Sequence, residues 1–404
     1  MSKLVQIALG VFTSIGGFLE VGAIATTAQA GAAYGFQLIW AVLLGTICVT
    51  FLVEMSGRLA AVSRHTIKDA LRERFGPRIY MITLVSDVII NLMVLAAEIG
   101  GMSLALQLVT GISFRWWAIP VGLLTWLVLW KGSFGLIEKG VSLLGMVALV
   151  FLVAAFRLKP SLAEIGQGVL PSLPTDRPLH YWFIAVGILG AAISPYLFYF
   201  YSSGAIEDDW DESHIGVNRA VAVIGMGFGG LLATSVLIVA AMLFHPLGIE
   251  PDRFEQVALL LSEPLGRLGF YLFAATLFIC CLGAALELAL ATSYSFAQGL
   301  GWNWGENVRP RNASRFTLVY TVMIAAVSIM MVSGINPLEL TLLSMALTAL
   351  VLPLVTFPFL ILMNDPDYVG DQGNGWISNT AVIAISVLGS LLALVAIPLQ
   401  LMGG

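Results

Sequence analysis

The chain has 404 residues, of which 59% are hydrophobic and only 11% are charged. Soluble domains carry about a quarter charged residues, so this composition excludes a soluble enzyme and a disordered protein, and we expect no nucleic-acid partner. The apolar segments are too long for an outer-membrane β-barrel, whose strands alternate in polarity. The composition therefore predicts an all-α integral membrane protein in the lipid bilayer, with residues 1–404 forming one transmembrane domain.

Eleven apolar segments are long enough for a membrane-spanning helix, which needs about 20 residues. Most of the 19 Lys and Arg residues fall on the connections of one side, and such a bias marks the cytoplasmic side. It predicts a cytoplasmic N-terminus and an outside C-terminus, in the inner (plasma) membrane of a bacterium or archaeon. The basic residues between Arg64 and Arg78 are interpreted as determinants of this topology. The predicted spans are residues 6–32, 36–62, 79–110, 114–131, 137–157, 181–204, 215–245, 265–297, 314–333, 337–363 and 375–401.

The first and sixth predicted spans contain residues that interrupt a helix. Glu20 lies beside Gly22 in the first span, and Pro195 follows Gly190 in the sixth. Glycine weakens a helix interior, and proline removes a backbone hydrogen bond. Two interrupted spans in matching halves are typical of a transporter whose binding site lies at the bilayer midplane. Kinks without function are the alternative, but the carboxylate of Glu20 in the first interruption favours a site.

The spacing of these two spans predicts an internal repeat. Because the interrupted spans are five apart, the first five spans and the next five are expected to form a 5+5 inverted repeat. The repeat units are residues 1–157 and 181–363, and residues 375–401 add one extra helix. The sequence contains no ATPase motif, so an ion gradient is the expected energy source.

Four stretches resemble the natural-resistance-associated macrophage protein (Nramp) transporters. Residues 20–32, EVGAIATTAQAGA, resemble the family's first helix, which reads Asp-Pro-Gly-Asn followed by Ala-Thr and Gln-Ala-Gly. Residues 97–100, AEIG, resemble the third helix, and residues 194–196, SPY, stand where the family has Met-Pro-His. Residues 343–353 resemble the tenth helix. The resemblance implies a LeuT-like fold of eleven transmembrane helices and secondary transport of divalent metal, usually with protons.

The resemblance places the family's metal ligands at three positions of this chain. The aspartate and asparagine of helix one fall on Glu20 and Ala23, and the methionine of helix six falls on Ser194. Glu20 keeps the charge, but Ala23 lacks an amide oxygen and Ser194 lacks the thioether, a soft ligand that favours transition metals. We therefore expect a divalent cation as substrate, with Mg²⁺ or Mn²⁺ favoured over softer ions, and no resident cofactor. Further residues expected to line the site are Gly22, Thr27, Pro195, Tyr196, Glu287 and Met345.

Acidic residues inside the predicted spans are costly in lipid and are usually functional. Asp87 and Glu98 are about three helical turns apart on one face of the third span, and we interpret them as a proton pathway, although Asp87 fits a structural role equally well. Glu287 is interpreted as a second carboxylate for the cation or as a proton acceptor, with a structural acid as the alternative. None of these acids has a lysine or arginine nearby in sequence.

The residues leave three functional hypotheses open. The main one is a secondary transporter of divalent cations, coupled to protons, that rocks helices one and six against the rest of the protein. The second is a proton- or sodium-coupled carrier of a small organic solute, favoured by the space that Ala23 and Ser194 would leave. The third is a membrane sensor that binds an ion without translocating it.

Overall fold

The computed structural model describes residues 18–132, 146–172, 177–305 and 308–401, with residues 399–401 described by their backbone alone. Every regular element in these ranges is a helix, which confirms the predicted all-α fold. Eight of the described helices are long and apolar enough to cross a membrane. The total of eleven spans stays a prediction, because the first and fifth predicted spans begin outside the described ranges.

The helices keep the order of the predicted spans. Their bounds are α2 Val21–Tyr34, α3 Ile39–Ser63, α4 Ile67–Thr110, α5 Phe114–Lys131, η1 Met146–Ala148, α7 Leu149–Leu158, α8 Leu162–Gly168, α9 Pro178–Ala192, α10 Pro195–Glu207, η2 Glu212–His214, α11 Ile215–Leu243, η3 His245–Leu247, α12 Phe254–Val257, α13 Leu259–Leu300, α14 Ser314–Val332, α15 Pro337–Leu362, α16 Pro366–Val369, η4 Gly370–Gln372 and α17 Trp376–Leu401. The sixth predicted span is therefore two helices, α9 and α10.

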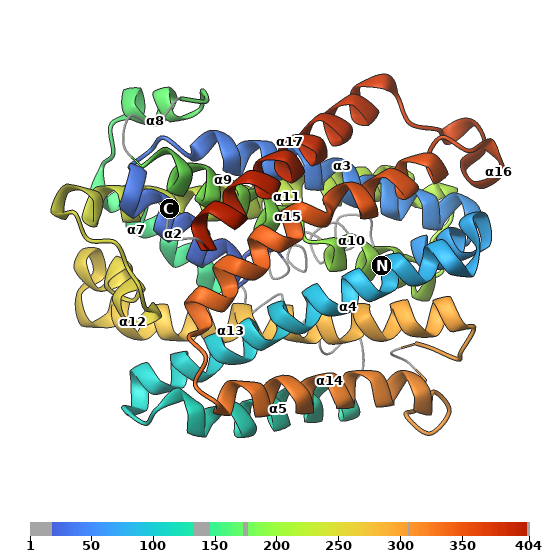
Figure 1. The fold of residues 1–404 in the computed structure, drawn as a ribbon, viewed down its shortest axis with the longest axis horizontal. Helices are drawn as coiled ribbons and strands as arrows, with labels where there is room; N and C mark the ends of the chain where they lie inside the picture. Colours follow the sequence, from blue (N-terminus) through green and yellow to red (C-terminus); the bar gives the residue numbers. More distant parts are fainter. Residues whose placement is uncertain (1–17, 133–145, 173–176, 306–307, 402–404) are drawn as a thin grey trace.

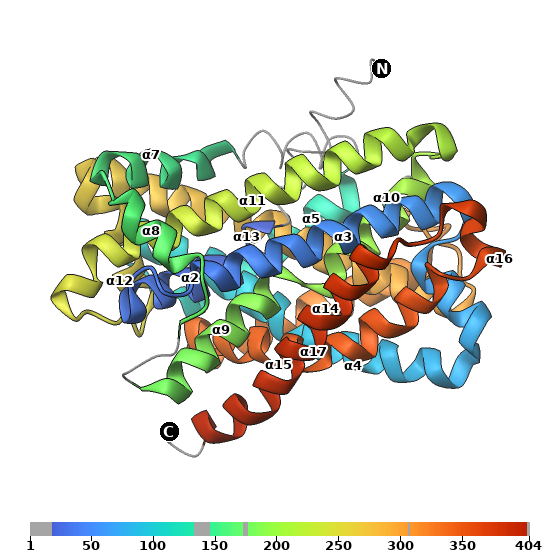
Figure 2. The same cartoon turned by 90° about the horizontal axis from the view of Figure 1, so that it is seen from above.

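The long helices form a bundle with two distinct sides (Figure 1). On one side α4 runs along α13, and the pair α5 and α14 packs beyond them. On the other side α11 packs along α3 and α2, as the view from above also shows (Figure 2). The helix α15 joins the two sides because it packs against α4, α9 and α17. The short helices α12 and α16 mark the two opposite ends of the bundle.

The helix α2 is buried along its whole length. Its sequence, VGAIATTAQAGAAY, consists mostly of small residues, and all of its residues except Ala33 are buried. Small residues let neighbouring backbones approach closely in a membrane protein. At Gly31, for example, an added Cβ would lie 2.2 Å from the carbonyl oxygen of Leu237 on α11. The fold therefore places the start of α2, and Glu20 before it, in the middle of the protein.

The helix α4 changes direction near its start. Gly76 has φ 78° and ψ 171°, a conformation that glycine adopts readily and other residues do not. Pro77 follows and has no backbone N–H to continue the helical ladder. The stretch from Ile67 to this kink is thus a separate segment at the α16 end of the bundle, ahead of the part of α4 that crosses the membrane.

Candidate functional site

Both predicted helix interruptions are present in the described residues. Glu20 precedes α2 with extended backbone angles, φ −92° and ψ 177°. Between α9 and α10, Ile193 has φ −110° and ψ 46°, and Ser194 has φ −67° and ψ 119°. Pro195 occupies the first position of α10, where its missing N–H costs no helical hydrogen bond. The chain therefore leaves the helical conformation at the two places that glycine and proline predict.

The two interruptions meet at the carboxylate of Glu20. The Tyr196 hydroxyl donates to Glu20 Oε2 at 2.6 Å, and the Ser194 hydroxyl lies 3.3 Å from Glu20 Oε1. Glu20 is 1% exposed. Although it stands at the N-cap position of α2, its side chain does not cap the helix. Its carboxylate makes no ion pair with any residue of the described ranges, and the side-chain hydrogen bonds that it accepts there come from these two hydroxyl groups.

The predicted helix-one residues take up different roles around this carboxylate. Thr26 and Thr27 donate to the carbonyl oxygens of Gly22 and Ala23, at 2.8 and 2.5 Å, so both hydroxyls bond back to their own helix. Ala23 is 3% exposed and offers only a methyl group. Of the two predicted ligand residues in this part of the chain, Glu20 and Ala23, Glu20 directs carboxylate oxygen atoms toward the interruption between α9 and α10.

Met345 reaches the same place from α15. A Cβ built on Gly22 would lie 2.4 Å from Met345 Cε, 2.7 Å from Met345 Sδ and 3.1 Å from Glu20 Oε1. Met345 is fully buried. At Gly190 an added Cβ would lie 1.8 Å from the Met345 carbonyl oxygen. Met345 thus has its backbone against α9 and its thioether beside α2.

The other two predicted acids lie close to this centre. Glu98 on α4 is fully buried, accepts from the backbone N–H of Val21 at 3.3 Å through Oε1, and hydrogen-bonds the Cys281 thiol of α13. Its Oε2 atom has no hydrogen-bond partner among the described residues. Glu287 is 7% exposed, and Glu20, Glu98 and Glu287 all lie within electrostatic range of Tyr196. The structure therefore brings three carboxyl groups near one tyrosine, from the segment before α2, from α4 and from α13.

Asp87 belongs to a second polar cluster nearer the start of α4. The basic residues from 64 to 78 were interpreted as determinants of topology, but one of them, Lys68, is only 1% exposed and forms an ion pair with Asp87. Its ammonium nitrogen also lies 3.6 Å from the ring centroid of Tyr199. A buried carboxylate and an aromatic face stabilise a cation that the apolar interior would otherwise exclude.

A polar face of α4 links the two clusters. Between Asp87 and Glu98, Asn91 is 4% exposed and donates to the Thr292 hydroxyl at 2.9 Å. Sequence reasoning identified the two acids but did not identify Asn91, Lys68 or the Cys281 contact. Only Asn91 had a usable signal, since it lies one helical turn from Asp87 on the same face.

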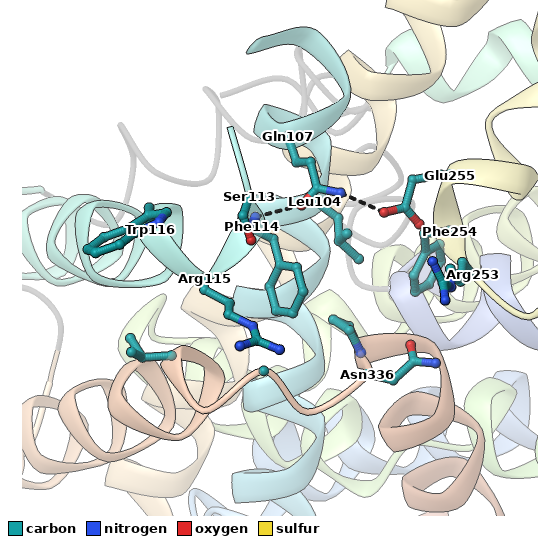
Figure 3. Close-up of a pocket in the computed structure, with 13 residues that line it drawn as sticks. Leu104, Gln107, Ser113, Phe114, Arg115, Trp116, Arg253, Phe254, Glu255 and Asn336 are labelled. Atoms are coloured by element: carbon teal, nitrogen blue, oxygen red, sulfur yellow. Dashed lines mark hydrogen bonds between the residues drawn. The ribbon is translucent and has the colours of Figure 1, made fainter. Parts of the chain in front are cut away.

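The donor set at Glu20 differs from a common metal cluster. In the described part of the chain, no group of three or more His, Cys, Asp or Glu residues is arranged to hold a metal ion. A cavity of about 770 Å³ lies elsewhere, at the α12 end, where Arg115 and Arg253 face it and Gln107 donates to Glu255 at 2.6 Å (Figure 3). None of the predicted site residues lines this cavity. The candidate site is instead the closed centre around Glu20.

Comparisons with known proteins identify the family of the chain. The sequence model of the family described as natural resistance-associated macrophage protein-like matches residues 10–398. The divalent metal cation transporter MntH of Deinococcus radiodurans is 27% identical over 392 residues, covering 93% of this chain and 86% of that protein.

Solved structures show the same fold. A manganese transporter of Eremococcus coleocola, in complex with an aromatic bis-isothiourea compound, superposes with a TM-score of 0.80 at 19% identity, covering 99% of this chain and 87% of that one. Mhp1, a nucleobase-cation-symport-1 family transporter, superposes with a TM-score of 0.63 at 13% identity, covering 97% and 92%. Interrupted helices that meet at a buried acid, the LeuT-like fold and the family match lead to one conclusion: the chain is an integral membrane protein that belongs to the Nramp family.

Proposed function

We propose that the chain is a secondary transporter, and not an enzyme, that moves divalent metal cations across a prokaryotic plasma membrane by alternating access. The observation that carries this proposal is the meeting of two helix interruptions at the buried carboxylate of Glu20. A charge at this depth is expensive unless it serves a site. Family membership and the resemblance to a divalent metal cation transporter support the same function.

The chemistry of the centre suits a cation. Glu20 supplies a negative charge, and the Ser194 and Tyr196 hydroxyls now directed at it supply oxygen atoms that a cation would bind after their hydrogens turn away. Glu98 and Glu287 add negative potential from neighbouring helices. A divalent ion entering this centre replaces the two hydroxyl hydrogen bonds with stronger interactions, which gives an ion the advantage over the hydroxyl-bonded state.

We also propose that metal transport is coupled to the movement of protons. Glu98 lies next to Glu20 and has one carboxylate oxygen without a partner among the described residues, so it is suited to take up the proton that Glu20 would release when the ion binds. From Glu98 the polar face of α4 leads through Asn91 toward Asp87, and we infer that this is the proton route.

The distribution of basic residues supports a cytoplasmic N-terminus, with the α16 end inside and the C-terminus outside.

The organic-solute alternative loses its main argument. It depended on space left by Ala23 and Ser194, but Met345 fills the position beside Gly22 that faces Glu20. No other observation in the described residues favours a larger substrate, so we retain the cation.

Uptake by purified protein in proteoliposomes tests the proposal. The wild-type chain is expected to accumulate Mn²⁺, and Glu20→Gln is expected to abolish uptake because it removes the central charge. Glu164→Gln, on the exposed part of α8, makes the same chemical change away from the site and is expected to leave uptake unchanged. Absence of Mn²⁺, Mg²⁺ and Cd²⁺ uptake by the wild-type protein would refute metal transport.

A further inference from the structure

We propose that the cavity at the α12 end of the bundle binds an anionic ligand that carries a phosphate group, held by the guanidinium groups of Arg115 and Arg253. None of the residues described around Glu20 lines this cavity, so the inference goes beyond the proposed function and does not depend on it. The cavity has a volume of about 770 Å³, which lies within the range of about 300–1,000 Å³ that is usual for sites of small organic ligands.

Several helices border the α12-end cavity. Its walls are the ends of α4 and α14 and the starts of α5, α12 and α15. Arg115 comes from the first turn of α5, and Arg253 immediately precedes α12. Figure 3 shows the two side chains on different sides of the cavity. A ligand that binds both arginines would therefore tie α12 to α5.

The protein itself does not neutralise the two arginines. Neither makes an ion pair with any residue of the described part of the chain. Among the described residues that line the cavity, Glu255 is the one acid, and its Oε1 atom already accepts from Gln107 Nε2 at 2.6 Å. The lining therefore keeps an excess of positive charge, which a bound anion would balance.

A glycine in the cavity wall accommodates the guanidinium of Arg115. A Cβ built on Gly334 would lie 2.2 Å from Arg115 Cζ and 2.2 Å from its Nη2 atom, so the guanidinium lies directly on the backbone between α14 and α15. Gly334 has φ 87°, a conformation that glycine adopts readily and other residues do not. A larger residue at this position would displace the guanidinium, so the local backbone supports the position of Arg115.

One amide group joins three walls of the cavity. Gln107 of α4 accepts from the backbone N–H of Phe114, at the start of α5, at 2.6 Å through Oε1. Its Nε2 atom donates to Glu255 of α12, as Figure 3 also shows. The walls that carry the two arginines are thus linked before any ligand arrives, and a preformed site loses less conformational entropy on binding.

The surroundings favour a lipid head group as the source of the phosphate. Trp116, which also lines the cavity, is 78% exposed, and Trp117 follows it. Tryptophan is enriched at the level of the lipid head groups, and basic pockets between membrane-spanning helices bind anionic head groups. Arginine suits this ligand because its planar guanidinium can donate two parallel hydrogen bonds to a phosphate. A soluble phosphate ion offers the same chemistry, so the experiment includes both sources.

Thermal unfolding of the delipidated full-length protein in detergent measures binding, because a ligand of the folded state raises the unfolding temperature. The probes are phosphatidylglycerol, phosphatidylcholine, whose phosphate is balanced by its own ammonium group, and inorganic phosphate. Phosphatidylglycerol is expected to stabilise the wild type more than phosphatidylcholine does. Arg115→Gln and Arg253→Gln are each expected to need roughly tenfold more phosphatidylglycerol for the same shift. Arg267→Gln removes an exposed arginine of α13 that does not line the cavity, and it is expected to respond like the wild type.

Two further measurements keep the test decisive. Native mass spectrometry is expected to show that the wild type retains one more phosphatidylglycerol molecule than Arg115→Gln/Arg253→Gln. If that double variant does not fold, Arg115→Lys provides the comparison, because it keeps the charge but loses the planar pair of donors, and an intermediate affinity is expected.

The outcomes separate the sources of the ligand. Stabilisation by inorganic phosphate alone, lost in the two cavity variants, would support the site with a soluble ligand. Equal responses of the wild type and all variants to phosphatidylglycerol, or no response to any probe, would overturn the proposal. Since neither measurement involves transport, its failure would leave the proposed function untouched.

Discussion

The hydroxyl of Tyr196 donates to the carboxylate of Glu20 at 2.6 Å, across 176 residues of sequence. One partner begins α10 and the other precedes α2, so this single hydrogen bond joins the two interrupted helices. It also occupies an oxygen atom that a bound cation would need. The bond therefore stabilises the protein without metal, and under the proposed function we expect it to break when a cation binds Glu20.

Tyr196→Phe is expected to destabilise the metal-free protein more than the metal-bound protein. Leaving a buried acceptor without its donor costs about 1–3 kcal/mol, so the free energy of unfolding without metal is expected to fall by about that amount. Added Mn²⁺ is expected to stabilise the variant more than the wild type, as thermal unfolding in detergent would measure. Tyr199→Phe is the control, because the Tyr199 hydroxyl has no partner among the described residues. Equal Mn²⁺ stabilisation of both variants and wild type would contradict this prediction.

Lys68→Met is expected to destabilise the protein severely. It leaves Asp87 as a buried charge without its cation, and breaking a buried ion pair on one side costs about 3–5 kcal/mol. The double variant Lys68→Met/Asp87→Asn is expected to recover much of this loss in chemical unfolding, because no charge is then left alone. Arg74→Gln, which breaks the pair between the exposed Arg74 and Asp365, is expected to cost only about 0–1 kcal/mol. Similar losses for Lys68→Met and Arg74→Gln would show that the buried pair is not important for stability.

Glu98→Gln is expected to separate metal movement from proton movement. Glu20 remains in this variant, so Mn²⁺ binding should persist, whereas the carboxylate proposed to take the proton is gone. Proteoliposomes that contain a pH-sensitive dye are expected to show Mn²⁺ uptake with little accompanying acidification. Glu164→Gln again provides the matched control. Undiminished acidification by Glu98→Gln would place the proton acceptor elsewhere.

The ion pair between Arg177 and Glu250 is expected to make the free energy of unfolding depend on pH in the acidic range. It joins the start of α9 to the connection after α11, with Arg177 Nη1 lying 3.0 Å from Glu250 Oε2. The Arg177 guanidinium beside it lowers the pKa of the Glu250 carboxyl below its usual range. Because the folded-state pKa is the lower one, the stabilisation is present above the unfolded-state pKa and is lost as the pH falls through the folded-state value.

Glu250→Gln removes this dependence. The variant is expected to melt at a slightly lower temperature than the wild type at neutral pH, and the difference is expected to vanish at acidic pH. Glu263→Gln is the control variant, because it removes the charge of an exposed glutamate on α13. A difference that grows on acidification would have the wrong sign and would exclude the pair as its cause.

The sequence was sufficient to locate Glu20, Ser194 and Tyr196 because each lies at a local signal. Glycine and proline interrupt helices wherever they stand, and an acid inside an apolar span is rare enough to identify by itself. The all-α fold followed from the long apolar runs. The inverted repeat stays a prediction, since the described ranges omit residues 1–17 and 133–145.

Lys68 could not be placed in the same way, and Met345 was expected at the site only through the family resemblance. A lysine among other basic residues next to a predicted connection has the sequence context of a surface residue, and nothing local indicates that Asp87 and the ring of Tyr199 enclose it. A methionine in an apolar helix looks like any core residue. Its proximity to Glu20 arises from close approach at Gly22 and Gly190, which depends on how α15 packs between two distant helices.

The burial of α2 on every side also bears on how quickly the protein can change conformation. Alanine and glycine have no side-chain rotamers to lose when they are covered. Where α2 presents alanine and glycine to α11, the two surfaces can therefore separate and rejoin with little re-ordering of side chains, so the entropic cost of closing again is low there. A helix built from larger residues would hold its neighbours through many immobilised side chains, each of which would have to be ordered anew in every cycle. In this protein, the small residues of α2 therefore lower the side-chain entropy that is lost each time the helix next to Glu20 packs again.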